Sequence, residues 1–553
     1  MTIDSLYNNI DKNNFYIGRI SQVYRDNSVA QVENLSLLAH RKMVDEFLIP
    51  NTINYLVVIE SVKGVFLGEV FQTKVPSSEN LHESINHGKT ETVFPEINID
   101  IIGLMSYCDK KFVLPEFLTV GITDKVFLAN KNVIQIYLNS IEVNGLLENK
   151  LSPFATYLNM NEEEVSLSPS TLFSHHLLVV GATNSGKSTS ALSILDKMIT
   201  EKKKVLIIDP TGEYYNSFSL QEVRKLSLGI DTTISPGKVS MQQWTMLFET
   251  NSNTQSAVLS EAIRSLRYQQ KNGQTIFLKK DGENIAQMQQ QLASVTRADT
   301  DFDISLLPEQ IAAESVSEPN RGANYAYDTF KVNANSYLVQ KVTYQLGNTN
   351  FLKFFSHNQQ MNNLLDEIDS FVHTPNSSLY INTSSLGATE GIGGMIIDLI
   401  CNFVILQDNI LPFAFFIDEV HRYTRSQYSE NEFHNGLTFI AREGRKKGIF
   451  LFLTTQNPQD VSPVLLGQVG TLLVHRLTHN DEIRAIQNHL DDYSIKHIKK
   501  LNQGECILTS VNLLHNVFIH VKKSKRKQNN SNFIKKFRKL WVYIFRKTYG
   551  RIK

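Results

Sequence analysis

The sequence predicts an α/β fold in which helices cover a parallel β-sheet, with a small antiparallel β-barrel before the sheet and a helical insertion within it. Three observations support this prediction. Residues 15 to about 140 form short β-rich runs, and from His175 onward buried apolar runs alternate with helical patterns. Residues 241–374 are polar, rich in Gln and Asn, and helical in pattern.

These changes of composition predict five segments in a chain of 553 residues, which has room for about three or four domains. In chain order they are a barrel over 1–150, the first part of the core over 151–240, the insertion over 241–374, the second part of the core over 375–520 and a basic tail over 521–553.

The N-terminal barrel is predicted from many short strands. The runs are FYIGRISQVY, VAQVENLSLL, YLVVIESVKGVFLGEVFQ, INIDIIGLM, FLTVGITDKVFLA and VIQIYL. Lys63 and Gly64 separate two β-rich stretches of the third run, which predicts a tight hairpin. Closure into a barrel would remove the exposed edges of so many strands, and an open sandwich is the alternative.

The core is predicted to be a parallel sheet because its strands are apolar on both faces. The runs are HHLLVVG, KKKVLIID, SSLYINTS, LPFAFFIDE, KGIFLFLTTQ and GTLLVHRL, with helical patterns such as MIIDLICNFVILQ between several of them. In such folds ligands bind at the carboxyl ends of the strands. We interpret residues 241–374 as helical because a structureless loop of that length is implausible in a compact domain.

Composition and charge indicate the cellular compartment of the protein and the kinds of partner it could bind. The chain has no basic segment followed by an apolar one at its start, no apolar run long enough to span a bilayer, and three cysteines that are far apart. We therefore expect a cytoplasmic protein without membrane spans. Lys and Arg together number 55, as do Asp and Glu, but residues 521–553 contain thirteen Lys/Arg and no Asp/Glu. Such a basic tail points to nucleic acid, anionic lipid or an acidic protein surface.

A phosphate-binding loop is the most informative motif. HLLVVGATNSGKSTSALSILDKM contains the spacing G-x-x-x-x-G-K-[ST] directly after an apolar strand and before a helix. Backbone N–H groups and the helix N-terminus would hold the phosphates, Lys187 would reach the β- and γ-phosphates, and Ser188 would bind Mg²⁺. The predicted nucleotide-binding residues are Gly181, Ala182, Thr183, Asn184, Ser185, Gly186, Lys187, Ser188 and Thr189.

A second motif selects the reaction. The strand FAFFIDEVHRY ends in Asp418 and Glu419, and the pair suits ATP hydrolysis, with Asp418 holding the Mg²⁺ shell and Glu419 activating water. No guanine-reading NKxD motif appears. The later strand in GRKKGIFLFLTTQNPQD ends in Gln456, whose amide could sense the γ-phosphate or the attacking water, with a structural polar strand end as the alternative. The motifs together predict a RecA-like P-loop NTPase core with ATP and Mg²⁺ as ligands.

With these motifs the chain resembles the HerA family, hexameric DNA-translocating ATPases related to the FtsK motors. The resemblance rests on GATNSGKS, VLIIDPTGEYY, FFIDEVHRY and AREGRKKGIFLFLTTQNPQDVSPVLLGQVGTLLVHRLTHNDE, and it extends over residues 15–515. Asn184 stands where the family usually has glycine, and TTQNP replaces the commoner SQRP, so the arginine beside Gln456 is lost. Asn tolerates left-handed backbone conformations, so the turn should survive.

The resemblance implies a homo-hexamer of a bacterial protein that binds double-stranded DNA. It implies ATP sites between subunits, with an arginine supplied by the neighbour, and Arg442 and Arg445 are the candidates. It also implies a separate effector docked on the barrel, a nuclease in DNA end processing, or a nuclease or sirtuin-like NAD-consuming protein in defence against phage.

Two alternative functions stay open. The protein could be a nucleotide-operated scaffold or switch that controls an effector with little translocation, or a coupling ATPase of a secretion or conjugation machine. The tail beyond Asn530 has apolar residues at helical spacing with basic residues between them, which predicts an amphipathic helix. It would pack on a neighbouring subunit, lie along nucleic acid or rest on an anionic membrane.

Overall fold

The computed structural model describes residues 3–527, apart from gaps at 8–9, 26, 44–45, 50, 77–80, 89, 144–148, 159, 161–162, 252–253, 320–321, 357–359, 387–389 and 425–435. The predicted amphipathic helix beyond residue 530 lies outside the described residues. Two compact units make up the chain. Unit 1 comprises residues 1–172, 490–494 and 506–520, and unit 2 comprises residues 173–489, 495–505 and 521–553.

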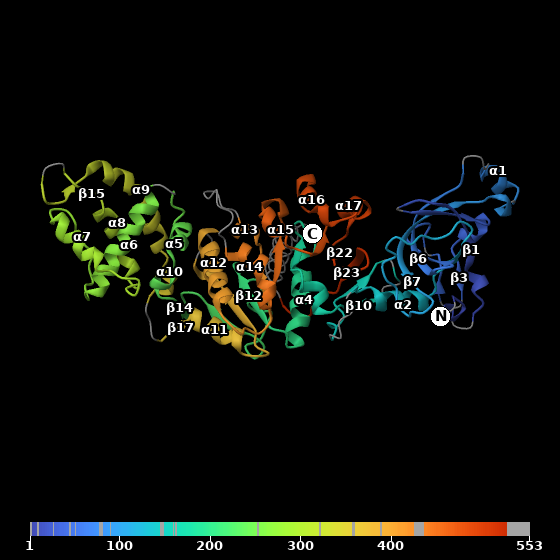
Figure 1. Ribbon diagram of the computed structural model, residues 1–553, viewed down its shortest axis with the longest axis horizontal. Helices are drawn as coiled ribbons and strands as arrows, with labels where there is room; N and C mark the ends of the chain where they lie inside the picture. Colours follow the sequence, from blue (N-terminus) through green and yellow to red (C-terminus); the bar gives the residue numbers. More distant parts are fainter. Residues whose placement is uncertain are drawn as a thin grey trace, which may run out of the picture. The chain divides into compact units, whose positions relative to one another are not determined.

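A closed barrel forms the larger part of unit 1, which confirms the predicted N-terminal barrel (Figure 1). Its strands lie in the order β1-β2-β7-β6-β5-β8. Their bounds are β1 (Tyr16–Val23), β2 (Ser28–Val32), β5 (Leu56–Ser61), β6 (Gly64–Lys74), β7 (Glu96–Met105) and β8 (Lys125–Leu128). The predicted hairpin joins β5 to β6, where Ser61 pairs with Gly64. A Cβ on Gly64 would lie 2.5 Å from the Met105 carbonyl oxygen, so the strands approach too closely for any other residue.

One predicted strand, VIQIYL, is wrong, because this stretch forms the helix α2 (Lys131–Ser140). The Asn130 side chain caps the helix by accepting a hydrogen bond of 2.9 Å from the Val133 N–H. Val133, Tyr137 and Ser140 are buried at helical spacing. The cap and the helical period therefore outweigh the strand preference of the branched residues.

Unit 1 also contains β9 (Ala155–Tyr157), β10 (Glu164–Val165) and most of β22 (Glu505–Ser510) and β23 (Val517–Val521). These strands lie in the order β10-β9-β23-β22. The sequence assigns them to the two core segments, 151–240 and 375–520. The structure groups residues 151–172 and 506–520 with the barrel, because these short strands pair with one another although they come from distant parts of the chain.

A parallel sheet organises unit 2, as the apolar runs predict. The order is β21-β11-β20-β19-β12-β18-β13, and the ladders between neighbours are parallel. The bounds are β11 (Leu177–Val180), β12 (Val205–Asp209), β13 (Arg224–Ser227), β18 (Leu379–Asn382), β19 (Phe413–Ile417), β20 (Ile449–Thr455) and β21 (Thr471–His475). Six of these match the predicted runs, while the edge strand β13 was not predicted. Among the surrounding helices are α4 (Lys187–Thr200), α12 (Glu390–Leu406) and α14 (Gly436–Glu443).

The insertion is helical, as predicted. Its main helices are α5 (Met241–Leu247), α6 (Gln255–Lys271), α7 (Ile285–Ala293), α8 (Leu307–Ala313), α9 (Thr329–Leu346) and α10 (Thr349–Phe354), drawn in green to yellow in Figure 1. Trp244 is fully buried and packs against Phe248, Phe302 and Phe355. This aromatic cluster gives the insertion a core of its own. Among the described helices, none is long and apolar enough to cross a membrane.

Candidate functional site

The loop between β11 and α4 contains two left-handed backbone positions. Asn184 has a φ of 65° and Gly186 a φ of 114°. Asn tolerates this region, and at Gly186 a Cβ would lie 2.9 Å from the backbone nitrogen of Gly504. Gly186 is also the N-cap of α4, so the loop leads directly into the positive end of that helix.

The loop between β11 and α4 packs closely against neighbouring side chains. A Cβ on Gly181 would lie 2.5 Å from Ser185 Oγ and 2.7 Å from His475 Cβ, so both side chains occupy the space that glycine leaves. The Gly504 N–H donates to the Ser185 carbonyl oxygen at 2.9 Å, and Gln503 Nε2 donates to Asn184 Oδ1 at 3.0 Å. These contacts hold the backbone amides of the loop in one arrangement.

Lys187 and Glu419 meet where the strands end. The Lys187 ammonium forms an ion pair with Glu419 Oε1, and the side chains are 5% and 8% exposed. Gln456 Nε2 donates to the same oxygen at 2.7 Å, while Thr183 Oγ1 donates to Gln456 Oε1 at 2.8 Å. The predicted residues of β11, β19 and β20 thus form one hydrogen-bonded chain from the phosphate loop to the carboxylate.

Glu419 has an unusual backbone. Its φ is 50°, in the left-handed region that a non-glycine residue seldom adopts. The Glu419 N–H donates to Thr454 Oγ1 at 3.0 Å, and His421 Nδ1 lies 3.3 Å from Glu419 Oε2. Burial acts to raise the pKa of Glu419, but the charge and hydrogen bonds of Lys187 and Gln456 outweigh it and hold the pKa below its ordinary value. Glu419 is therefore a fixed, ionised carboxylate.

Asp418 lies deeper than Glu419. It is 3% exposed and accepts a hydrogen bond of 2.5 Å from Thr454 Oγ1. Burial raises the pKa of Asp418 to about 7, although the Lys187 charge opposes the shift. Because this carboxyl lacks a full counter-charge, a divalent cation would favour its ionised form. Asp418 and the Ser188 hydroxyl supply the oxygen ligands that Mg²⁺ prefers, so the residues fit that ion.

Several residues of the site were not singled out from the sequence. Thr454 bridges Asp418 and Glu419, His421 lies beside Glu419, and His475 lies under the loop. Asp209, at the end of β12, is fully buried and accepts hydrogen bonds of 2.8 Å from the Gly212 N–H and the Tyr380 hydroxyl. Polar residues at the ends of apolar strands are the sequence signal that could have identified Asp209, Thr454 and His475.

Arg442 and Arg445 do not join this cluster. Both are exposed, on α14 and on the turn before β20. The His176 Nε2 lies 2.9 Å from the Ala441 carbonyl oxygen, so α14, which carries Arg442, packs beside the residue that precedes β11. Because the phosphate loop follows the other end of β11, the arginines lie at the opposite edge of the sheet from Lys187 of their own chain.

Comparison with known proteins identifies relatives of this chain. Residues 154–390 match the family model "Helicase HerA, central domain". A probable helicase of Methanocaldococcus jannaschii, MJ1565, is 22% identical over 353 residues, which cover 62% of this chain and 62% of the relative. The DNA double-strand break repair helicase HerA of Saccharolobus solfataricus is 24% identical over 356 residues, or 61% of this chain and 62% of the relative.

These matches thus span about 62% of the length of each relative. Among solved structures, VirB4 of Thermoanaerobacter pseudethanolicus aligns with a TM-score of 0.47 and 13% identity over 69% of this chain and 99% of that chain. The bacterial conjugative coupling protein TrwB aligns with a TM-score of 0.44 and 13% identity over 68% and 91% of the two chains.

Proposed function

We propose that this chain, whose residues 154–390 match the central domain of helicase HerA, is an ATP-hydrolysing ring motor of the HerA type that moves double-stranded DNA. The observation that carries the proposal is the hydrogen-bonded chain from Thr183 through Gln456 to Glu419 and Lys187. It joins a phosphate-binding loop to a carboxylate that is ionised and oriented. A site that only bound nucleotide would not require the second half of this arrangement.

The residues divide the reaction between them. The loop amides and the start of α4 would bind the phosphates, and Lys187 would turn from Glu419 to the β- and γ-phosphates. Glu419, then freed from its ion pair, would accept a proton from the attacking water as general base. Gln456 would keep Glu419 oriented, and Thr183 would hold Gln456 at the edge of the loop. ATP binding would therefore prepare the base for hydrolysis.

Ser188 and Asp418 would hold Mg²⁺ in this site. The ion would neutralise the negative charge that develops on the phosphates during hydrolysis. Thr454 would keep the Asp418 carboxyl oriented through its hydrogen bond of 2.5 Å.

A homo-hexamer would complete each site. A motor of this kind needs a positive charge opposite the γ-phosphate, and no arginine of the predicted pair lies near Lys187 of its own chain. Arg442 and Arg445 are exposed and lie at the opposite edge of the sheet from Lys187. One of them would supply the guanidinium in trans, since this group stays ionised and forks onto phosphate oxygens.

The barrel would dock an effector subunit. Between β7 and β8 the barrel exposes apolar side chains, namely Val113, Leu114, Phe117, Leu118 and Ile122. Phe117 is 97% exposed. Exposed apolar clusters of this kind mark protein interfaces. The partner would be a nuclease or a sirtuin-like NAD-consuming enzyme, acting in DNA end processing or in defence against phage.

The test is whether double-stranded DNA stimulates ATP hydrolysis by the purified protein. A DNA motor should hydrolyse ATP faster with duplex DNA than without it, and should displace a triplex-forming strand or a roadblock from that DNA. Hydrolysis that ignores DNA but responds to a co-purified effector would instead assign the chain to nucleotide-operated switches. The sequestered Lys187–Glu419 pair would then serve to keep basal hydrolysis slow.

A further inference from the structure

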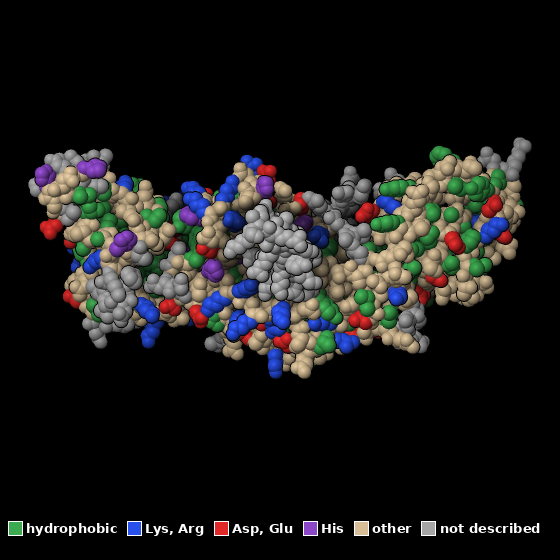
Figure 2. Space-filling model, turned by 180° about the vertical axis from the view of Figure 1, so that it is seen from behind, with side chains coloured by type: hydrophobic (Ala, Val, Ile, Leu, Met, Phe, Trp, Pro, Cys, Tyr) green, Lys and Arg blue, Asp and Glu red, His purple; other side chains and the backbone are tan. Residues whose placement is uncertain are grey.

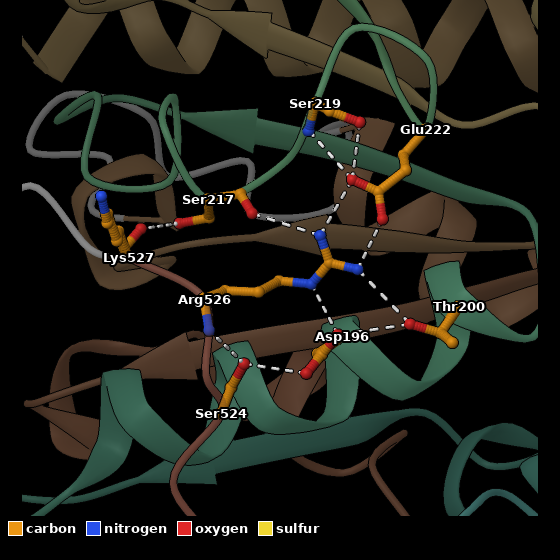
Figure 3. A network of polar contacts seen from close by, with 8 residues as sticks. All are labelled: Asp196, Thr200, Ser217, Ser219, Glu222, Ser524, Arg526 and Lys527. Atoms are coloured by element: carbon orange, nitrogen blue, oxygen red, sulfur yellow. Dashed lines mark hydrogen bonds and ion pairs between the residues drawn. The ribbon is translucent and has the colours of Figure 1, made fainter.

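The end of α4 farthest from the phosphate loop is tied to the last described residues of the chain (Figure 3). Arg526 Nε lies 2.5 Å from Asp196 Oδ1, and the two terminal nitrogens of Arg526 lie 2.7 and 3.0 Å from the Glu222 carboxylate oxygens. The guanidinium carbon lies 4.9 Å from the centre of the Phe218 ring. Two-pronged contacts of this kind are among the stronger hydrogen bonds in proteins.

The backbone beside Arg526 is also held in place. Ser524 Oγ donates to Asp196 Oδ2 at 2.8 Å, and Ser217 Oγ donates to the Lys527 carbonyl oxygen at 2.8 Å. The Arg526 side chain retains only 15% of its exposure. Residues 524–527 therefore follow one defined path over unit 2.

This path turns lysines outward. Lys523, Lys525 and Lys527 are exposed, whereas Ser524 and Arg526 between them are partly buried. More lysines lie in the last turns of α4 and just after it. We call the whole set the basic surface, and its members are Lys197, Lys202, Lys203, Lys523, Lys525 and Lys527. In Figure 2 several Lys and Arg side chains lie in the lower middle of the view, with a few Asp and Glu side chains among them.

The local charge balance is strongly positive. The six lysines and Arg526 carry seven positive charges, and the acidic residues beside them in sequence or bound to Arg526, namely Asp196, Glu201 and Glu222, carry three negative charges, which leaves a net charge of +4. The segment that follows, residues 528–553, adds eight Lys/Arg and no Asp/Glu. A solvated run of charges does not need to be held in place by other residues. Here Asp196 and Glu222 of unit 2 bind Arg526 and so hold the segment that carries the lysines.

The basic surface lies apart from the nucleotide site. α4 starts at the phosphate loop and ends just before β12, so its last turn is at the edge where the parallel strands begin. We propose that the basic surface binds the phosphate backbone of duplex DNA, as a second anion-binding site on each subunit. This inference rests on the proposed function, because a motor that moves duplex DNA brings such a backbone close to the ATPase unit. Lysine ammonium groups recognise phosphate oxygens as point charges, without regard to base sequence.

The experiment compares two triple variants of the full chain. Lys523→Ala, Lys525→Ala and Lys527→Ala remove the outward row, while Lys63→Ala, Lys110→Ala and Lys111→Ala remove three exposed lysines from the barrel as a matched control. Binding of a fluorescent DNA duplex is measured by anisotropy between 50 and 200 mM salt, without nucleotide. We expect the first triple to weaken binding at least about tenfold at low salt and to reduce the slope of log K against log salt by about 2 to 3. The control should leave both quantities unchanged.

Other results would overturn the proposal. An unchanged slope, or an equal loss in both triples, would mean that the row makes no specific phosphate contacts. Binding to vesicles of anionic lipid without binding to the duplex would assign the surface to membranes. A lower oligomeric mass of the first triple would assign it to subunit contacts.

Variants of Arg526 test whether its contacts with Asp196 and Glu222 hold the exposed lysines in place. Arg526→Ala should also weaken DNA binding, because Arg526 holds the segment that carries Lys523, Lys525 and Lys527. Arg526→Lys should weaken binding less. Since binding is measured without ATP, its outcome is independent of whether the wild-type protein hydrolyses ATP. Failure of hydrolysis would contradict the proposed motor, whereas failure of the salt test would contradict only the basic surface.

Discussion

Lys187 and Glu419, 232 positions apart in the chain, neutralise each other in a buried ion pair. The residue that would bind the phosphates and the residue that would activate water therefore contact each other directly. Each would be released by the same event, because a triphosphate competes with Glu419 for the Lys187 ammonium. This relationship couples binding to activation without requiring any movement of the sheet.

Gln456 is expected to position Glu419 rather than to bind ATP. Gln456→Ala removes the hydrogen bond of 2.7 Å to Glu419 and the bond of 2.8 Å from Thr183. We expect kcat to fall about tenfold while KM changes less than threefold, since a lost orienting contact acts on the chemical step. Steady-state kinetics of Gln456→Ala, Thr183→Val and the double variant measure this. Because the residues form one chain, the double variant should lose little more than Gln456→Ala, and fully additive losses would argue that they act separately.

The arginine that acts in trans can be identified by subunit mixing. One of the variants Arg442→Ala and Arg445→Ala removes the arginine that acts in trans. That variant should reduce hydrolysis by about a hundredfold or more without preventing assembly. Mixing that inactive variant with Glu419→Gln should restore part of the activity, because some interfaces then combine an intact arginine with an intact glutamate. Lys446→Ala is the control from the same exposed turn. If neither mixture recovers activity, the arginines do not act between subunits.

Two buried histidines should make the stability of unit 2 sensitive to acid. Burial lowers the pKa of both His176 and His475 to about 4. An unfolded histidine has a pKa of about 6.5, so between these values the unfolded chain binds more protons than the folded chain. The stabilisation is complete above about pH 6.5 and is lost as the pH falls toward 4, by about 1 to 3 kcal/mol for each residue.

Urea unfolding at pH 7.5, 6 and 5 tests this dependence. His176→Asn should be less stable at every pH, because His176 accepts a bond from the Leu451 N–H and donates one to the Ala441 carbonyl oxygen. Its stability should nevertheless fall less steeply with acid than that of the wild type. His520→Asn, at an exposed position, should keep the wild-type slope. Parallel slopes for wild type and His176→Asn would contradict the assignment.

The core could be predicted from the sequence because its motifs are contiguous. Contacts between residues far apart in the chain could not be predicted in this way. Each of these motifs lies within one continuous segment, with a period or spacing set by local geometry. They are the phosphate loop, the Asp418–Glu419 pair and six apolar strands. The helix α2 was mistaken for a strand because its branched residues prefer strands, while the Asn130 cap was overlooked. The contact between Arg526 and Asp196 joins residues 330 positions apart, and nothing in either local sequence specifies the partner.

The most direct measurement of the central claim compares ATP binding and hydrolysis in Lys187→Ala and Glu419→Gln. Lys187→Ala should lose ATP binding. Glu419→Gln should bind fluorescent ATP at least as tightly as the wild type, because Lys187 no longer has to leave an ion pair, while hydrolysis falls about a hundredfold or more. Glu443→Gln, a half-exposed glutamate in unit 2, should behave like the wild type in both assays. Hydrolysis by Glu419→Gln at the wild-type rate would contradict the account, since the carboxylate held beside the phosphate loop would then not be the base.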